Sequence, residues 1–413
     1  MDNEVVNKND NKFNFAIWVM LSVSLLALIA DYMVIPYYAI YFTDVLKFSL
    51  VFSGLALAAF SLSSKISNFI GGFLTDRFNP EIFINTGFTL MILSYCSFIF
   101  IKTQIMFFIM LIILGVGDGC IGIAMKYKLV AQCKTLAQRA RMFSLMSIAT
   151  NLGSMIGPVV GFWILKYSYS VVFVCVTLIY ALAFLSILLF TNRSVKEEVE
   201  SKDSILGIKS ILSHKQFVSF LILILGFYII FSQFQFSIPI VLKTLYSADA
   251  ASKISIIFAL NGFVIILAQY PITRWLESRN TLNLTLMGFS ILVASYGLIA
   301  LQQYFNTHFG VIYTFVVMFT IGEILFNTFS NSYVATISPE KRLGTYFGFL
   351  GVAMGVGSAL GNYISGDIIS KYVNTAPHLI WIVLISLSTA TFILFFMVRG
   401  VTRINVGANE HEK

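Results

Sequence analysis

Four charged residues interrupt the long apolar stretches of this sequence: Asp31, Lys65, Asp118 and Glu323. A charge at the centre of a bilayer costs about 2.5–3.5 kcal/mol on insertion scales, so it normally faces a cavity or a partner. Removal from water favours the neutral form of a carboxylic acid, and such a group can pass a proton between two compartments. We therefore interpret the four residues as candidates for proton coupling or substrate binding.

Three of the four also have a structural interpretation. Asp31 and Lys65 can neutralise each other, since buried charges usually pair. Asp118 lies between two glycines and can bond to the backbone of a neighbouring helix. Glu323 is the hardest to explain in this way, because its own apolar segment contains no base.

Membrane-spanning helices must position these charges. Hydrophobic residues make up 58% of the chain and charged residues only 11%, whereas a soluble domain contains about 25% charged residues. The mean hydropathy is +0.86. A spanning helix needs about 20 mostly apolar residues, and the chain contains twelve such segments, which predicts an all-α membrane protein. The predicted helices are 15–42, 50–75, 82–101, 105–127, 142–165, 168–191, 216–242, 254–276, 282–303, 309–333, 345–369 and 379–398.

The four charged residues share one depth in these helices. With a rise of about 1.5 Å per residue, each lies about 18–22 Å below the outer end of its helix. This layer is near the bilayer midplane, where transporters place substrate and coupling-ion sites.

Lysine and arginine are concentrated on one side of the predicted membrane. When both termini are cytoplasmic, most basic loop residues are cytoplasmic too, as the positive-inside rule requires. The net charge of +8 therefore follows from topology and gives no reason to expect a nucleic-acid partner. We expect a cytoplasmic tail over 1–14, a six-helix bundle over 15–191, a cytoplasmic loop over 192–215, a second bundle over 216–398 and a cytoplasmic tail over 399–413.

The fifth predicted helix carries a glycine pattern that favours close helix packing. Gly153, Gly157 and Gly161 are four residues apart, and Pro158 follows the middle glycine. Small residues at this spacing let another helix approach closely, and the proline bends the helix. Gly357 and Gly361 in the eleventh helix repeat the first two glycines at the same spacing, along with Phe347 repeating Phe143, which indicates a parallel repeat of six helices.

The pattern G-x3-G-P-x2-G resembles the antiporter motif in exporters of the major facilitator superfamily. A second motif follows the second helix, where Gly72, Asp76 and Arg77 resemble the G-x3-D-R-x-G-R-R/K loop of that family. The match departs over 79–81, where Asn, Pro and Glu replace a glycine and two basic residues. Segments 269–275 and 322–348 resemble the drug:proton antiporter branch.

The resemblance implies two six-helix bundles that work by alternating access and export amphipathic organic compounds in exchange for protons. In the family, the loop motif locks the two halves in one state, and helices 1, 4, 7 and 10 line the cavity. Asp31, Asp118 and Glu323 fit that placement. We also expect the face of Gly157 to be an interface that moves between the bundles. Further candidates for cavity lining are Tyr37, Tyr41, Tyr228, Phe231, Gln233 and Phe234.

Two alternative transport functions remain open at this point. Export of one endogenous metabolite, such as a siderophore, is favoured if Lys65 and Lys126 face the cavity. We expect Lys126 and Lys128 to extend to cytoplasmic headgroups. The alternative is that they guide an anionic substrate inward. Proton-coupled import is the second alternative, and the antiporter motif argues against it.

Other classes of function fit the sequence less well. An integral-membrane enzyme needs a nucleophile or a metal cluster, whereas the four histidines lie in loops or tails and the four cysteines lack ligand spacing. A channel does not need the two-bundle repeat. We expect a non-enzymatic monomer in the bacterial inner membrane, with a small-molecule substrate, protons and the lipid bilayer as partners, and with no cofactor or metal.

Overall fold

The computed structural model describes residues 14–75, 78–133, 136–191, 211, 213–305, 310–339 and 342–410. Helices dominate these residues, and 12 of them are long and apolar enough to cross a membrane. Their order matches the sequence prediction, and their ends differ from it by only a few residues. The predicted all-α membrane architecture is therefore confirmed.

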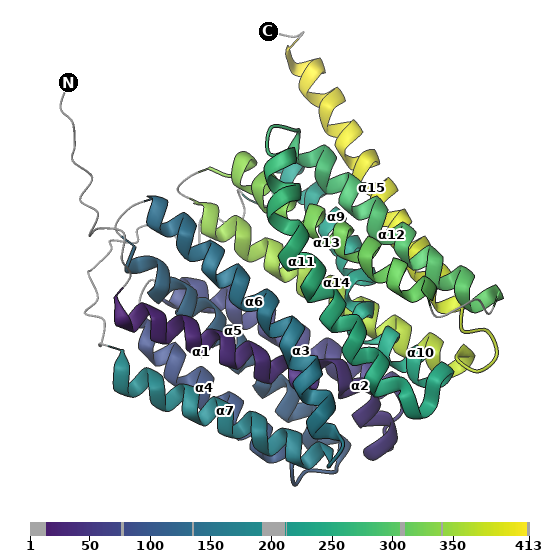
Figure 1. Ribbon diagram of the computed structural model, residues 1–413. Coiled ribbons are helices and arrows are strands. Elements are labelled where there is room, and N and C mark those ends of the chain that lie inside the picture. Colours follow the sequence, from purple (N-terminus) through teal and green to yellow (C-terminus); the bar gives the residue numbers. More distant parts are fainter. Residues whose placement is uncertain are drawn as a thin grey trace.

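The first six spans form one bundle, at the lower left of Figure 1. The first helix packs against the fifth and sixth, the second packs against the fourth, and the third lies against the fourth and sixth. The helices of this bundle are α1 (Phe15–Val34), α2 (Tyr38–Ile40), α3 (Leu50–Thr75), α4 (Pro80–Phe98), α5 (Gln104–Ala131), α6 (Leu136–Leu165) and α7 (Tyr169–Phe190).

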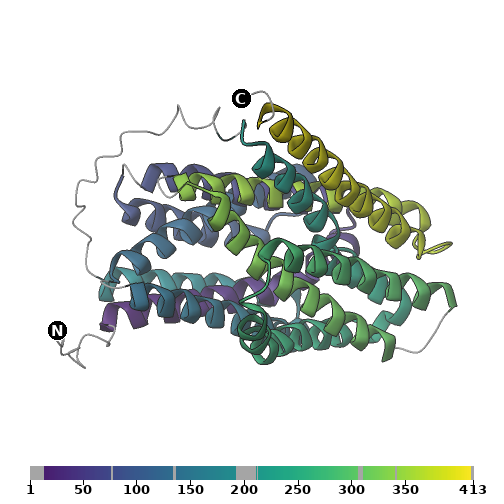
Figure 2. The same cartoon turned by 90° about the horizontal axis from the view of Figure 1, so that it is seen from above.

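The last six spans form a second bundle beside the first, as the view from above in Figure 2 also shows. The seventh span packs against the eleventh and twelfth, and the ninth packs against the tenth and twelfth. The helices are α9 (Lys215–Phe231), α10 (Ser237–Tyr246), α11 (Ala250–Leu276), α12 (Thr281–Phe305), α13 (Gly310–Ile337), α14 (Leu343–Tyr372) and α15 (Leu379–Glu410). The last helix thus continues past 398, where the sequence predicted a tail, and residues 192–210 of the predicted central loop lie outside the described residues.

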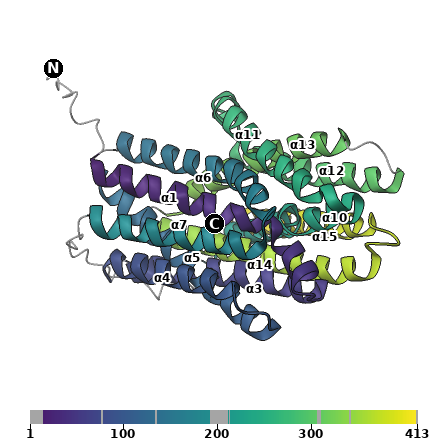
Figure 3. The ribbon, with the colours of Figure 1, turned by 60° about the horizontal axis from the view of Figure 1, so that its bottom comes forward.

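The two most extensive contacts between the bundles are made by the helix pairs α3 with α14 and α6 with α11. Figure 3 shows α14 running beside α3. In each pair, the second span of one bundle contacts the fifth span of the other. The repeat predicted from the glycine pattern therefore appears as a twofold relation between the contacts of the two bundles.

The first and seventh spans are broken, although the sequence predicted continuous helices. After Val34 the first span continues as a 3-10 turn containing Pro36, a short α2 and a wider turn over Tyr41–Val45. The seventh span changes from α9 to a 3-10 turn at Ser232 and resumes as α10, which contains Pro239 near its start. Both breaks lie close to a proline. Proline interrupts a regular helix because it lacks the backbone N–H that the helix uses as a donor.

Candidate functional site

Asp31 on α1 is held by two tyrosines of its own bundle. Its Oδ1 accepts hydrogen bonds from Tyr95 on α4 at 2.8 Å and from Tyr180 on α7 at 2.7 Å. The two phenol rings are stacked, with centroids 5.6 Å apart. Among the residues that the structure describes, no ion pair joins Asp31 to Lys65. The ion pair that the sequence left open is therefore not formed here, and Asp31 is bonded to the two tyrosines instead.

Asp118 on α5 bonds to the neighbouring helix α3 through a side chain. Ser64 donates its hydroxyl to Asp118 Oδ2 at 2.5 Å. The adjacent Gly119 brings the two backbones together, since a Cβ at this position would lie 2.7 Å from the backbone nitrogen of Asn68. The partner of Asp118 is thus a hydroxyl rather than the backbone group that the sequence suggested.

Glu323 on α13 is bonded to a neutral amide from α11. Asn261 donates from Nδ2 to Glu323 Oε2 at 3.0 Å and to Thr320 Oγ1 at 2.9 Å. Within the described part of the chain, no base forms an ion pair with Glu323. Asn261 was missed in the sequence, although an amide inside an apolar helix is itself a sign of a specific partner.

The three acids lie on three helices of the two bundles, with Asp31 on α1, Asp118 on α5 and Glu323 on α13. Over the described residues, no group of three His, Cys, Asp or Glu side chains is placed to hold a metal ion. The arrangement is suited to proton exchange and hydrogen bonding.

The lysines near this site have different surroundings. The stem of Lys65 lies at the bundle interface, where a Cβ added to Gly355 of α14 would be 2.8 Å from its Cβ. Lys126 is exposed. Lys128 is buried and its Nζ lies 3.1 Å from Glu81 Oε1. The prediction that Lys128 extends to the headgroups is wrong, because α5 continues to Ala131 and Glu81 neutralises Lys128 inside the bundle.

Comparison with known proteins decides the family. The model of the Major Facilitator Superfamily matches residues 20–362 and, in a second match, residues 251–411. The chain belongs to the major facilitator superfamily. It is thus a multi-pass membrane protein of a family of transporters, and the resemblance seen in its motifs is confirmed.

Relatives of this transporter include multidrug resistance proteins. The chain is 25% identical to "Multidrug resistance protein MdtH" of Salmonella paratyphi B over 390 residues, which are 92% of the chain and 93% of the relative. It is 26% identical to the protein of that name from Yersinia enterocolitica, over 83% and 84% of the two chains. The expected similarity to multidrug resistance proteins is therefore confirmed.

Solved structures of other transporters share the fold. The nucleoside transporter NupG has a TM-score of 0.74 and 15% identity, over 93% of this chain and 99% of that one. A POT family transporter in complex with a thioalcohol-conjugated peptide has a TM-score of 0.76 and 15% identity, over 94% and 96%. At these identities the likeness shows the fold alone.

The aromatic and amide candidates for cavity lining divide into two groups in this transporter. Tyr37 donates its hydroxyl to the carbonyl of Pro158 at 2.8 Å, and Gln233 donates to the carbonyl of Ile229 at 2.8 Å. These two residues are buried, as are Tyr41 and Phe234. Tyr228 and Phe231 are only half-buried. The lining role stays a prediction, and the last two residues fit it better.

The glycine face of the antiporter motif packs inside the first bundle. A Cβ at Gly153 would lie 2.6 Å from Leu28 Cβ, and one at Gly157 would lie 2.7 Å from the carbonyl oxygen of Ile29. Gly161 likewise faces Met33, so all three glycines contact α1. The expectation of an interface between the bundles is wrong for this face, because α6 meets the other bundle on a different side.

The contact of α6 with the second bundle instead involves a glycine of α11. A Cβ added to Gly262 of α11 would lie 2.7 Å from Met155 Cβ. Further along the pair, Asn151 donates to Gln269 at 3.1 Å. These contacts join the fifth and eighth spans directly.

Only part of the loop motif after α3 can be placed. Asp76 and Arg77 lie outside the described residues. A Cβ added at Gly72 would have no neighbour within 4 Å, whereas a Cβ added at Gly71 would lie 2.9 Å from the side chain of Ile123. The lock between the bundles therefore stays a prediction.

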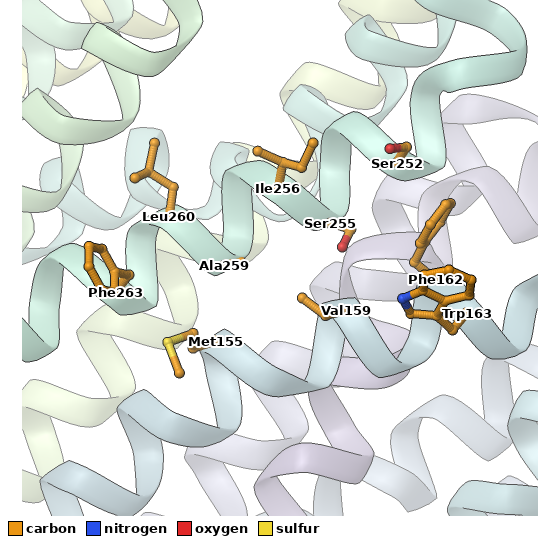
Figure 4. A pocket seen from close by; sticks show the side chains of 10 residues that line it. All are labelled: Met155, Val159, Phe162, Trp163, Ser252, Ser255, Ile256, Ala259, Leu260 and Phe263. Atoms are coloured by element: carbon orange, nitrogen blue, oxygen red, sulfur yellow. The ribbon is translucent and has the colours of Figure 1, made fainter.

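An apolar recess lies between α6 and α11, and Figure 4 shows its side chains. It contains none of the charged candidates, and several of its residues are exposed apolar side chains such as Trp163 and Phe263. At its edge, Lys166 Nζ lies 3.6 Å from the ring centroid of Trp163. In a membrane, such an exposed apolar surface faces lipid. The lining residues are Met155, Val159, Phe162, Trp163, Ser252, Ser255, Ile256, Ala259, Leu260 and Phe263.

Proposed function

We propose that this protein is a proton-coupled exporter of amphipathic organic compounds that works by alternating access. The observation that carries the proposal is Glu323, whose half-buried carboxylate is bonded to the neutral amide of Asn261. An acid held by a base is fixed in its ionised form, whereas an acid held by an amide can be bonded in either form. Glu323 can therefore take up a proton on one side of the membrane and release it on the other.

Asp31 and Asp118 are the proposed partners of Glu323 in coupling. Both accept hydrogen bonds from hydroxyl groups, which also tolerate a change of protonation. Asp31 and Asp118 lie in the first bundle and Glu323 lies in the second, so the proposed coupling uses carboxyl groups of both bundles.

The relatives named multidrug resistance proteins support the choice of amphipathic compounds. We further propose a monomer in the bacterial inner membrane with both termini cytoplasmic, and the domain boundaries expected from the sequence. Gly72, Asp76 and Arg77 remain the proposed conformational motif of the loop after α3.

Transport by the purified protein in proteoliposomes, under an imposed pH gradient and with a panel of amphipathic compounds, tests this function. Glu323→Gln keeps a hydrogen-bonding group but cannot ionise, so it should abolish pH-driven transport while the protein still folds. Glu277→Gln is the matched control, because Glu277 is exposed at the end of α11. Undiminished pH-driven flux in Glu323→Gln would remove this residue from the mechanism.

The direction of coupling is read from the same assay. An exporter that exchanges its substrate for protons moves the compound against the direction of proton flow. Movement of both in the same direction would establish import instead.

A further inference from the structure

The apolar recess between α6 and α11 is about as long as one membrane leaflet is thick. On α6 its lining extends from Met155 to Trp163, and on α11 it extends from Ser252 to Phe263. At a rise of about 1.5 Å per residue, these stretches are about 12 and 16 Å long. Half of a hydrocarbon core of about 30 Å is about 15 Å. The recess therefore begins near Leu165, where α6 ends, and reaches toward the middle of the membrane.

The recess is a hollow between two helices rather than an even lipid-facing surface. Its volume is about 530 Å³, within the range of about 300–1,000 Å³ that is usual for small-molecule sites. Figure 4 shows Ala259 on α11 between the larger side chains of Ile256 and Phe263. The small side chain of Ala259 leaves space between these neighbours. Because Ile256 and Phe263 are exposed, this space is open to the membrane.

Polar groups gather at one end of the recess. The hydroxyl-bearing residues of the lining are Ser252 and Ser255, and both lie near Trp163 at the end where α6 stops. Figure 4 shows the hydroxyl of Ser255 directed toward α6. The opposite end, at Met155 and Phe263, is apolar. An occupant with an apolar chain and one polar end fits this arrangement.

A lysine lies at the polar end. Lys166 follows the last residue of α6, and its Nζ is 3.6 Å from the ring centroid of Trp163 and 5.3 Å from that of Phe162. Both rings line the recess, so the ammonium group is at its mouth. Lys166 is exposed, and none of the ion pairs between described residues includes it. Lys253 places a second positive charge in the first turn of α11, next to Ser252.

We propose that the recess binds one chain of an anionic phospholipid whose phosphate contacts Lys166. The apolar walls hold the chain, and a positive charge at the membrane surface favours an anionic headgroup over a zwitterionic one. The bound lipid contacts both α6 and α11, which form one of the two most extensive contacts between the bundles. This lipid site is independent of the proposed proton coupling and of the transported compound.

Trp163 itself reports which lipid occupies the recess, because bromine atoms on a lipid chain quench tryptophan fluorescence at short range. Trp18→Phe and Trp275→Phe remove two exposed tryptophans. Subtracting the signal of a protein that also carries Trp163→Phe removes the emission of the buried Trp381. The full-length protein is reconstituted in vesicles of equal amounts of phosphatidylcholine and phosphatidylglycerol, with one of the two lipids brominated at a time.

We expect quenching of Trp163 to show that phosphatidylglycerol is preferred about fivefold or more, since one lysine near the surface attracts an anionic lipid by about that factor. Lys166→Gln should lower this preference about fivefold, and Lys166→Arg should retain it. Lys102→Gln is the control, because Lys102 is exposed in the loop between α4 and α5 on the same side of the membrane.

A second variant tests whether the chain lies in the recess. Ala259→Leu fills the space between Ile256 and Phe263, so it should remove most of the preference for phosphatidylglycerol at Trp163. Ala259→Val is the smaller filling variant if Ala259→Leu does not fold. Ala294→Leu is the control, because Ala294 is exposed on α12.

Four results would overturn the lipid site. Equal quenching by the two brominated lipids would mean that the headgroup is not recognised. An equal effect of Lys166→Gln and Lys102→Gln would indicate general attraction to the membrane surface. An unchanged preference in both Ala259 variants would place the lipid outside the recess. Little quenching by either lipid would mean that a second copy of the chain or another protein covers the recess. The proteoliposome assay with Glu323→Gln tests the transport function separately from all four.

Discussion

At the scale of single residues, the half-buried acids Asp31 and Glu323 are held by neutral donors. Asp31 is bonded to Tyr95 and Tyr180, and Glu323 is bonded to Asn261. A salt bridge of similar burial would fix each acid in its charged form. Neutral donors instead keep the carboxyl groups in position and leave their protonation free to change.

The tyrosines should contribute to stability as well as to the position of Asp31. Tyr95→Phe and Tyr180→Phe each remove one hydrogen bond to a carboxylate, and each should cost about 1–3 kcal/mol. Thermal unfolding of the purified protein measures the loss. Tyr167→Phe is the control, because Tyr167 is 82% exposed. Unchanged stability in both variants would mean that the two hydrogen bonds contribute nothing to folding.

Among the described residues, Asp31 and Lys65 form no ion pair. A double-mutant cycle on these two residues tests this finding. A buried pair would make the double variant of Asp31→Asn and Lys65→Met more stable than either single variant, since each single change would leave an unpaired charge. We expect no such recovery in thermal unfolding, because Asp31 has tyrosine partners.

At the scale of helices, glycine serves two kinds of contact. The glycines of α6 face α1 within the first bundle, and Gly357 and Gly361 of α14 face α9 within the second in the same way. Contacts between the bundles use Gly262 and Gly355 on the opposite helices. Packing within a bundle concerns folding, whereas packing between bundles concerns the transport cycle.

Two leucine substitutions should separate these roles. Gly157→Leu inserts a side chain against the backbone of α1 and should destabilise the first bundle by about 1–3 kcal/mol or more. Gly262→Leu should leave the bundles folded, but it should push α11 away from Met155 and change which side is accessible. Folded yield measures the destabilisation. Labelling of single cysteines at the exposed positions Val45 and Ser332 measures the change in accessibility.

Gly297→Leu is the control for both substitutions, since nothing lies within 4 Å of a Cβ at that position. A normal yield for Gly157→Leu, together with altered accessibility, would restore the interpretation of the antiporter motif as a moving interface.

At the scale of the whole molecule, the two bundles are joined by repeat-related helix pairs and by an ion pair across their ends. Lys243 of α10 pairs with Asp44 of the first span, at the end of the first span opposite the N-terminus. Both side chains are about one-third exposed, at 34% and 37%. The pair holds the bundles together at that end.

Removal of this ion pair should favour opening of the same end. Exposed pairs are worth about 0.2–1 kcal/mol, which is at most about fivefold in the ratio of two states. Asp44→Asn and Lys243→Met should each increase labelling of a cysteine at Val45 by up to that factor. The charge-reversed double variant should restore the original labelling.

Lys371→Met is the matched control, because Lys371 pairs with Asp367 within α14 and joins no two bundles. Equal labelling in the Asp44 and control variants would show that the ion pair does not hold that end closed.

The sequence alone determined the number and order of the membrane helices and the positions along the chain of the four charged residues. Hydropathy depends on each segment by itself, so twelve apolar segments predict twelve spans. The motifs identified the family for the same reason, because they are short and local.

Only the tertiary structure decided which groups meet. Lys65, Tyr95 and Tyr180 are all distant from Asp31 in sequence. The packing of α1, α4 and α7 brings the two tyrosines within hydrogen-bonding distance of Asp31. A glycine spacing predicts a close helix contact but does not determine which helix makes it. The contact between α6 and α1 could therefore not be predicted from the motif. Hydropathy and glycine spacing describe one helix at a time, whereas a carboxylate or a helix face is satisfied by neighbours that only folding brings together.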